Sequence, residues 1–117
     1  MPRAASDSPR ERAGWVSLRR PAEFRRVLRR GRRIRTGGLT VVTAPGLEGV
    51  ARVGFIADRR VGSATRRNRA KRRLRHALAE VPPPPGTDNV VIASPEVVTA
   101  DYEEILEWLA RAFGQRR

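Results

Sequence analysis

The sequence predicts an α+β fold, a single sandwich in which one small, mostly antiparallel sheet packs against helices. Three short runs of β-branched and aliphatic residues, at 39–44, 51–57 and 89–93, are typical of strands. Segments with apolar residues at helical spacing lie before, between and after these runs. The chain has 117 residues, 39% of them hydrophobic, which suffices for one modest core and argues against a second domain.

The first helix is expected over the segment PAEFRRVLRRG. Pro21 suits the first turn of a helix, where its missing N–H would have no partner in any case. Phe24, Val27 and Leu28 recur along one face, and Gly31 is a plausible residue for the position just after the helix.

The residues before this helix are rich in Pro, Ser and Arg and lack apolar periodicity. We therefore expect residues 1–16 to form a disordered basic tail. The folded domain is expected over residues 17–114, followed by a short tail at 115–117.

Two strands are expected in the middle of the chain. The runs LTVVTA (39–44) and ARVGFIA (51–57) are separated by proline and glycine residues, so they are interpreted as neighbouring strands joined by a turn. Residues 32–35 are candidates to extend the sheet.

A second helix carries the most basic segment of the chain. The run RRNRAKRRLR (66–75) places seven basic side chains in ten positions. Either Ser63 or Thr65 is a candidate N-cap, and the helix must end before Pro82. Apolar residues recur through this region at the spacing of one helix face: Ala70, Leu74, Ala77, Leu78 and Val81.

The last elements follow the run PPPPG, which cannot continue a helix and favours an extended segment. The run NVVIA (89–93) then predicts a strand, and DYEEILEWLARAFG predicts a final helix with Asp101 and Glu104 at capping-box spacing. The predicted order is therefore α-β-β-β-α-β-α.

The charge of the chain is large and unevenly placed. Lys and Arg number 25 against 12 Asp and Glu, a net charge of +13. Residues 1–79 hold 22 of the basic and only five of the acidic residues. A positive field of this size attracts phosphate backbones, so nucleic acid is the leading partner and an anionic membrane surface the lesser one. No apolar stretch approaches the roughly 20 residues of a membrane span.

The residue types that many enzymes depend on are scarce here. The chain has no cysteine, which excludes disulfides, thiolate metal sites and cysteine nucleophiles, and it has a single histidine, His76. Asp58 is the only acid between Glu48 and Glu80, so no carboxylate cluster of a two-metal nuclease and no histidine pair is evident. We expect a protein of the reducing cytoplasm that contributes charge and shape to its partner.

The basic helix has a functional and a structural interpretation. Arg67, Lys71 and Arg75 lie one turn apart on a helix, with Asn68 and Arg72 beside them, and no acid occurs from 59 to 79. Such side chains repel one another unless phosphates lie between them, which favours a binding role. A solvated helix face is the alternative, although it normally mixes both signs of charge. The preference for arginine over lysine fits phosphate binding and equally fits a compositional bias.

The segment RVGFIADRRVGSATRRNRAKRRLRHAL resembles the central part of the bacterial ribonuclease P protein family. The family pattern is a Val-Gly-Phe/Leu strand, a basic pair, a Gly-Asn-Ala-like turn and an Arg-Asn-Arg helix that continues Lys-Arg-x-x-Arg. The resemblance covers roughly residues 18–113 and includes the tyrosine that opens the last helix. The matching residues are Val53-Gly54-Phe55, Arg59-Arg60, Gly62-Ser63-Ala64, Arg67-Asn68-Arg69, Lys71-Arg72, Arg75 and Tyr102.

The resemblance implies the protein subunit of an RNA-based endonuclease that removes the 5′ leader of precursor tRNA. The RNA subunit would perform the chemistry through magnesium, which it would mainly bind itself, with none held tightly by the protein alone. The implied partners are ribonuclease P RNA and precursor tRNA, with no membrane and no obligate protein partner. The family fold also implies a left-handed β-α-β crossover through the basic helix, where general rules favour the right-handed form by about 98%.

The resemblance also implies two sets of binding residues, to which we add candidates by charge and position. The set expected to contact the RNA subunit is Arg66, Arg67, Asn68, Arg69, Lys71, Arg72 and Arg75. The set expected to hold the single-stranded leader, in a cleft between the first helix and the sheet, is Phe24, Leu28, Val42, Arg52, Arg59 and Arg60.

The chain departs from the family pattern at several positions. Ser63 stands in place of the usual asparagine, and Ala70 in place of a larger aliphatic residue. Leu28 and Val42 align with positions of the cleft that are often aromatic, which leaves Phe24 as the aromatic residue of this set and implies weaker base stacking. A basic ribosomal or RNA-chaperone protein remains an alternative, because it would share the size and the charge. An independent nuclease is disfavoured by the missing acid–base residues.

Overall fold

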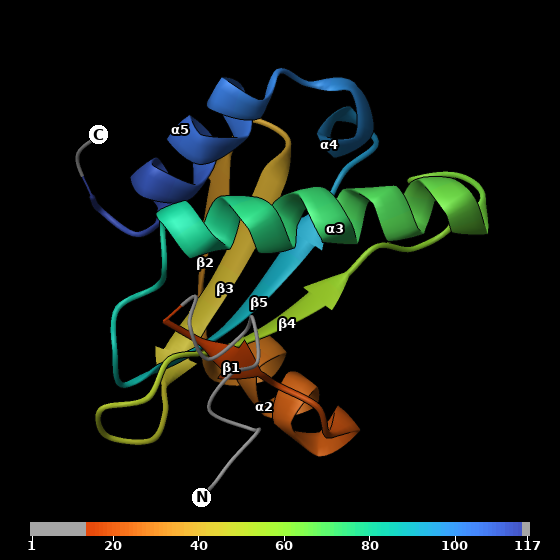
Figure 1. The fold of residues 1–117 in the computed structure, drawn as a ribbon. Helices are drawn as coiled ribbons and strands as arrows, with labels where there is room; N and C mark the ends of the chain where they lie inside the picture. Colours follow the sequence, from red (N-terminus) through yellow and green to blue (C-terminus); the bar gives the residue numbers. More distant parts are fainter. Residues whose placement is uncertain (1–13, 116–117) are drawn as a thin grey trace, which may run out of the picture.

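The computed structural model describes residues 14–115, and Figure 1 shows their arrangement. The predicted order of elements is confirmed, with a short strand, β1, added at the start and a one-turn helix, α4, before the last helix. The elements are β1 (Val16–Ser17), α2 (Pro21–Arg30), β2 (Arg32–Thr36), β3 (Leu39–Pro45), β4 (Arg52–Ile56), α3 (Ala64–Glu80), β5 (Thr87–Ala93), α4 (Glu96–Thr99) and α5 (Tyr102–Ala112).

The five strands form one open sheet in the order β1-β4-β5-β3-β2. The half formed by β5, β3 and β2 is antiparallel, as predicted, whereas β1, β4 and β5 are parallel to one another. The expectation that β3 and β4 are neighbours is wrong, because β5 lies between them. The physical reason is that β5 contains a continuous apolar run, Val90 to Ile92, that is covered on both faces, which suits a central strand.

The connection from β4 through α3 to β5 joins two adjacent parallel strands. In Figure 1, α3 lies in front of the sheet, both strands point upward, and β5 lies to the left of β4. This arrangement is a left-handed crossover, as the family resemblance implies and against the general rule.

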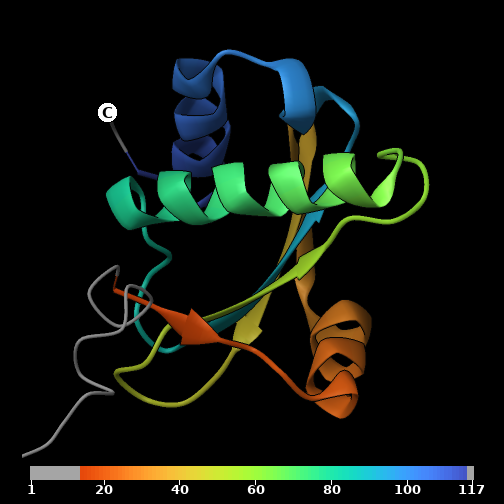
Figure 2. The ribbon, with the colours of Figure 1, turned by 45° about the vertical axis from the view of Figure 1, so that its right-hand side comes forward.

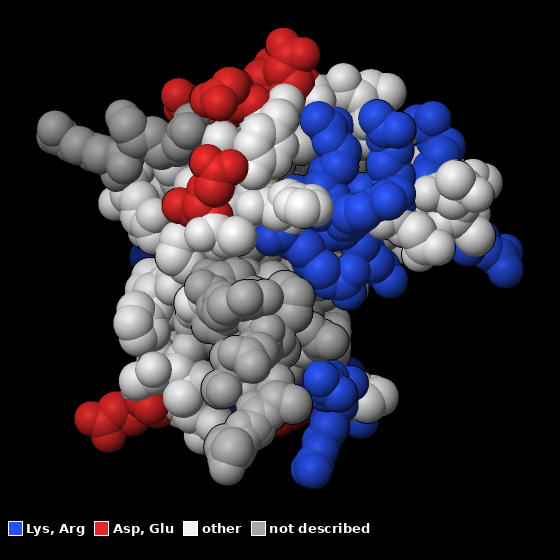
Figure 3. Space-filling model, in the orientation of Figure 1, with Lys and Arg blue, Asp and Glu red and all other residues white. Residues whose placement is uncertain are grey.

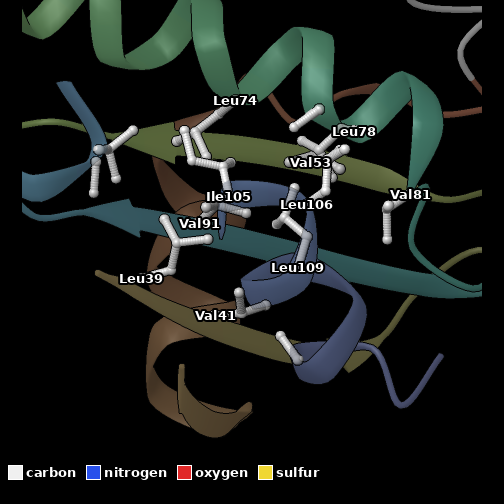
Figure 4. Close-up of a cluster of buried hydrophobic side chains, with 14 of the residues drawn as sticks. Leu39, Val41, Val53, Leu74, Leu78, Val81, Val91, Ile105, Leu106 and Leu109 are labelled. Carbon is white, nitrogen blue, oxygen red and sulfur yellow. The ribbon is translucent and has the colours of Figure 1, made fainter. Parts of the chain in front are cut away.

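Helices α3, α4 and α5 cover one face of the sheet, and α2 packs on the other face near one end (Figures 1 and 2). The main core lies between the sheet and the first three of these helices (Figure 4). Side chains from alternate strand positions meet the apolar stripes of α3 and α5 there. The largest of its fully buried residues include Leu39, Val41, Val53, Leu74, Leu78, Val91, Ile105, Leu106 and Leu109.

A smaller apolar cluster fixes α2 to the opposite face. Val27 of α2 is fully buried against Val42 and Val90 of the sheet. Gly31 follows the helix, as predicted, but with φ −78° it is not left-handed. It is required instead because a Cβ there would lie 2.7 Å from Val42 Cγ1 and 2.8 Å from the Thr43 carbonyl oxygen.

The folded part of the chain begins earlier than predicted. Of the tail predicted at 1–16, residues 1–13 lie outside the described residues, as do residues 116 and 117 of the predicted tail at 115–117. Trp15, however, is only 2% exposed and packs edge-to-face on Phe55 at 5.7 Å. Val16 and Ser17 pair with β4. Residues 15–17 are too few to show a periodic pattern, so this strand could not be predicted from the sequence.

Candidate nucleic-acid interface

The basic helix α3 begins at a tightly built turn. Gly62 has φ +131°, a conformation that side chains disfavour, and a Cβ there would lie 2.7 Å from the Cδ atom of Arg66. Ser63 is the N-cap, since its hydroxyl accepts a hydrogen bond from the Arg66 backbone N–H at 3.3 Å. Of the two predicted candidates for the cap, the structure therefore selects Ser63.

Two arginines of the first helical turn hold this turn in place. Arg66 donates through Nε to the Val61 carbonyl at 3.2 Å, and Arg67 donates to the Gly62 carbonyl at 3.1 Å. Both are in the set predicted to contact the RNA subunit. Each keeps further N–H groups for a ligand, because a guanidinium has five.

The next residues of the predicted set are exposed or half-exposed and point away from the core. The side chains of Arg69, Lys71 and Arg72 make no hydrogen bond or ion pair with any other described residue, and Asn68 is exposed beside them. Arg75 lies 5.3 Å from the centre of the Phe55 ring, a cation–π contact that orients its guanidinium. Figure 3 shows basic side chains gathered over the half of α3 that begins at Ala64. The predicted RNA-subunit set therefore surrounds the exposed part of α3, from the flank beside α4, where Arg66 and Arg69 lie, to the flank beside β4, where Arg75 lies.

One further arginine of α3 has a structural role. Arg73 donates to the carbonyl oxygens of Val97 at 2.7 Å and Ala100 at 2.6 Å, and so fixes α4 against α3. Arg66 and Arg69 lie on the same flank of the helix and line, with Arg73, a groove of about 550 Å³ beside α4. The exposed arginines flanking this groove extend the basic surface toward α4.

The predicted leader-binding residues lie on the opposite face of the sheet, around α2. Phe24 and Leu28 are partly exposed there. The Phe24 ring rests on Gly54 of β4, where any Cβ would overlap it, so this glycine is what lets the ring approach the sheet. Val42 belongs to the same cluster but has no exposed surface, and it forms the support beneath the helix.

Several residues of this face were not predicted. Arg35 of β2, Thr40 of β3 and Ile92 of β5 lie side by side in the strand register and, with Arg60, line a hollow of about 250 Å³. Thr40 and Ile92 share the α2 face because they lie two residues from Val42 and Val90, which pack under α2, and Arg35 shares it as the β2 partner of Thr40. Strand alternation was the signal that could have found them, once Val42 was assigned to this face.

Arg52 does not offer a free guanidinium to a ligand. It donates to both carboxylate oxygens of Asp88, each at 2.8 Å, and to Glu23 Oε2 at 2.8 Å. Arg26 of α2 pairs with the same, fully buried Asp88. Arg52 was expected to bind the leader, and the structure instead places it in an ion-pair cluster that ties α2 to the sheet.

The protonation of this cluster follows from its geometry. Burial alone would raise the pKa of Asp88, but the hydrogen bonds and charges of Arg52 and Arg26 outweigh it and hold that pKa below its usual value. Burial likewise opposes, without cancelling, the hydrogen bonds from Arg20 and Arg52 that lower the pKa of Glu23. The carboxylates are therefore charged and fully engaged with arginine.

The remaining predicted residues, Arg59 and Arg60, lie in the loop between β4 and α3. Both are exposed. Arg60 pairs with Asp58 at 3.0 Å, and its hydrogen bonds lower the pKa of that carboxyl. This loop leads from the strand beside the α2 face to the start of the basic helix, so it lies between the two predicted binding surfaces (Figure 2).

Two further findings concern the described residues alone. Within residues 14–115, no three Asp, Glu, His or Cys side chains are grouped so that they could hold a metal ion. No helix in the same part of the chain is both long enough and apolar enough to cross a membrane.

Comparison with known proteins identifies the family. A model of the Ribonuclease P family matches residues 15–116. The ribonuclease P protein component of Chloroflexus aggregans is 43% identical over 101 residues, covering 84% of this chain and 75% of that protein. That of Thermobifida fusca is 37% identical over 115 residues, covering 90% and 75%. The solved ribonuclease P protein of Thermotoga maritima superposes with a TM-score of 0.74 at 26% identity, covering 86% of this chain and 97% of that chain.

These matches support the interpretation drawn from the Arg-Asn-Arg helix and give no support to the ribosomal or RNA-chaperone alternative. They span the sheet and the helices on both of its faces. The chain belongs to the ribonuclease P protein family, the protein components of a ribonuclease that processes tRNA, and its partner is accordingly ribonuclease P RNA.

Proposed function

We propose that the chain binds the RNA subunit through α3 and the 5′ leader of precursor tRNA through the α2 face, while the RNA subunit carries the chemistry. The observation that supports this most strongly is the placement of the two surfaces. The exposed basic residues of α3 and the partly exposed residues around α2 lie on opposite faces of one sheet. A protein built in this way can hold both RNAs at once.

The α3 surface suits a folded RNA. Its free cations, Arg69, Lys71 and Arg72, project from a helix whose apolar face is buried and whose turn is braced by Arg66 and Arg67. A rigid, positively charged ridge can follow the phosphates of a structured RNA, and planar guanidinium groups can each bind a phosphate with two hydrogen bonds. The uncharged Asn68 in the middle of the ridge supplies a group that can distinguish one RNA site from another.

The α2 face suits a single strand. Phe24 offers a partly exposed ring on which a base can stack, Leu28 and Ile92 provide further apolar surface, and Arg35 and Arg60 supply charge beside them. Aromatic stacking together with basic side chains is the usual way in which proteins bind single strands without reading their sequence. We assign Val42 and Arg52 to the support of this surface rather than to contact with the leader.

We assign the hydrolytic chemistry to the RNA subunit and its magnesium ions. The carboxylates that lie among the basic residues are committed to arginine: Asp88 and Glu23 to Arg52, and Asp58 to Arg60. The chain's contribution is to lower the repulsion between the phosphates of leader and RNA subunit, which magnesium must otherwise screen. Such an assembly belongs in the cytoplasm, in keeping with a chain that has no cysteine.

Two variants should separate the surfaces. The double substitution Arg69→Ala, Arg72→Ala should weaken binding to isolated ribonuclease P RNA by about tenfold or more while leaving folding unchanged. Phe24→Leu keeps an apolar side chain under α2, so it should leave that binding intact and reduce the affinity of the assembled enzyme for leader-bearing precursor tRNA by about fivefold. Equilibrium binding titrations measure both affinities, that of the protein for ribonuclease P RNA and that of the assembled enzyme for precursor tRNA. If the α3 variant left RNA-subunit binding unchanged, or Phe24→Leu acted equally on leaderless tRNA, the assignment of the surfaces would be wrong.

A further inference from the structure

A second groove lies on the other side of the edge strand β2, away from the α2 face. It has a volume of about 420 Å³ and lies between β2, the loop of Pro84 and the end of α5. Its apolar lining includes Ile34, Pro84 and Phe113, and Phe113 is half-buried. Arg32 of β2 and Arg111 of α5 also line it, and both are exposed.

The alternation of β2 explains how one strand serves both faces. Arg33 and Arg35 pair with residues of β3 that lie on the α2 face, whereas Arg32 and Ile34 point to the α5 face. β2 is an edge strand of the sheet, so a ligand can pass around it from one face of the sheet to the other. Basic side chains therefore continue from the α2 face around the sheet edge into this groove.

The charges at the groove have no protein counterpart. Neither the Arg32 nor the Arg111 side chain makes a hydrogen bond or an ion pair with another residue in the described part of the chain. Charged residues on an edge strand commonly serve to prevent strand pairing between molecules, and that role alone would explain Arg32. It does not explain why a second element, α5, brings Arg111 and an aromatic ring to the same groove.

We propose that this groove is a second subsite for single-stranded RNA, which takes nucleotides of the leader upstream of those on the α2 face. A base would stack on Phe113 and the adjacent phosphates would lie between Arg32 and Arg111, a pairing of ring and cations that suits a nucleotide. The strand would reach the groove by passing around β2. The inference rests on the proposed function, because it takes the leader to be bound on the α2 face first.

The test uses the enzyme assembled with ribonuclease P RNA and precursor tRNAs whose leaders are lengthened one nucleotide at a time. The affinity of the assembled enzyme for precursor tRNA should rise in two steps as the leader is lengthened. The first step comes from binding on the α2 face and the second from binding in the groove. In Arg111→Ala and in Arg32→Ala the first step should remain and the second should shrink by about fivefold, the value of one nucleotide that is no longer held. Each variant should also make the salt dependence with long leaders shallower, by about 0.7 in log–log slope for each phosphate that the protein no longer binds.

Two controls keep the result specific. Arg19→Ala removes one exposed charge away from the groove, and it should keep both steps. Phe113→Leu retains an apolar side chain against the core and should diminish only the second step. The subsite would be overturned if the wild-type enzyme showed no second step. It would also be overturned if the second step survived in the Arg32 and Arg111 variants, or if Arg19→Ala abolished it equally. Absence of the first step would instead count against leader binding on the α2 face.

Discussion

Asp88 ties α2 to the sheet through two ion pairs. Asp88 lies in β5, and its fully buried carboxylate is bound by Arg52 of β4 and Arg26 of α2. It therefore joins these two strands to helix α2. Arg52 also reaches Glu23 of α2, which adds a second tie. Since α2 carries Phe24, this cluster determines where the ring lies relative to the sheet.

Replacing Asp88 with asparagine leaves two arginines beside each other without their shared counter-charge. We expect Asp88→Asn to lower the free energy of unfolding near neutral pH by about 2–4 kcal/mol, because the partly buried guanidinium groups of Arg26 and Arg52 lose the buried carboxylate between them. Urea denaturation measures the change. Glu48→Gln, which removes an exposed carboxylate, is the matched control and should change stability by less than about 0.5 kcal/mol.

The same cluster predicts a dependence on pH. The pKa of Asp88 is lower in the folded chain than its unfolded value of about 3.9, so the cluster stabilises the fold above that value. The stabilisation is lost as the pH falls through the folded pKa. The difference in stability between wild type and Asp88→Asn should therefore be constant near neutral pH and shrink in strongly acidic solution. A difference that stayed constant into strong acid would show that the charge of Asp88 does not stabilise the fold.

At the scale of elements, α3 combines a fully buried apolar face with an exposed face that repels itself. Its buried residues hold it to the sheet and to α5, and Tyr102 of α5 reinforces this contact by donating to Glu80 at 2.5 Å. No acid lies between residues 59 and 79 to neutralise the exposed face. The buried face therefore holds the basic side chains close together, and a bound polyanion would relieve the repulsion between them.

Salt dependence separates charge from specificity on this helix. If about five of its basic residues bind phosphates together, affinity for ribonuclease P RNA should fall with salt at a log–log slope of about −3 to −5. If the uncharged Asn68 amide makes a buried hydrogen bond with the RNA, Asn68→Ala should keep that slope and weaken binding by about 1–3 kcal/mol. Titrations at several salt concentrations give both values. A slope near zero would exclude phosphate binding, and a variant that bound like wild type would make Asn68 a bystander.

The long elements could be predicted because their signals are local. The apolar spacing of α3, the capping box of α5 and Pro21 at the start of α2 are all readable from neighbouring residues. The elements that were missed are those fixed by distant contacts. β1 is two residues held by pairing with β4, and α4 is a single turn held by Arg73.

The site was predictable to the same extent. The exposure of the basic residues of α3 follows from helical periodicity, because the apolar positions Ala70, Leu74, Ala77 and Leu78 are buried and the basic residues lie outside them. The α2 face depends on which strands are neighbours, and the insertion of β5 between β3 and β4 was not evident locally. Ile92 was missed for that reason, whereas strand alternation from Val42 could have found Thr40 and its β2 partner Arg35. The carboxylates that bind Arg52 come from α2 and β5, far away in the sequence.

At the scale of the whole molecule, the charge is segregated. Basic side chains gather over the first half of α3, whereas acidic side chains gather over α5 and the far end of α3 (Figure 3). The acidic residues of α5 include Glu103, Glu104 and Glu107. This uneven distribution of charge should orient the molecule as it approaches RNA.

The most direct test of this account measures cleavage of precursor tRNA against magnesium concentration, with ribonuclease P RNA alone, the protein alone and the two together. The protein alone should not cut. The RNA alone should cut at the 5′ end of the mature tRNA at high magnesium, and adding the protein should lower the magnesium needed for leader-bearing substrate only. Cleavage by the protein without RNA would contradict the assignment of the chemistry to the RNA subunit. A magnesium requirement unchanged by the protein would contradict the electrostatic role proposed for its two surfaces.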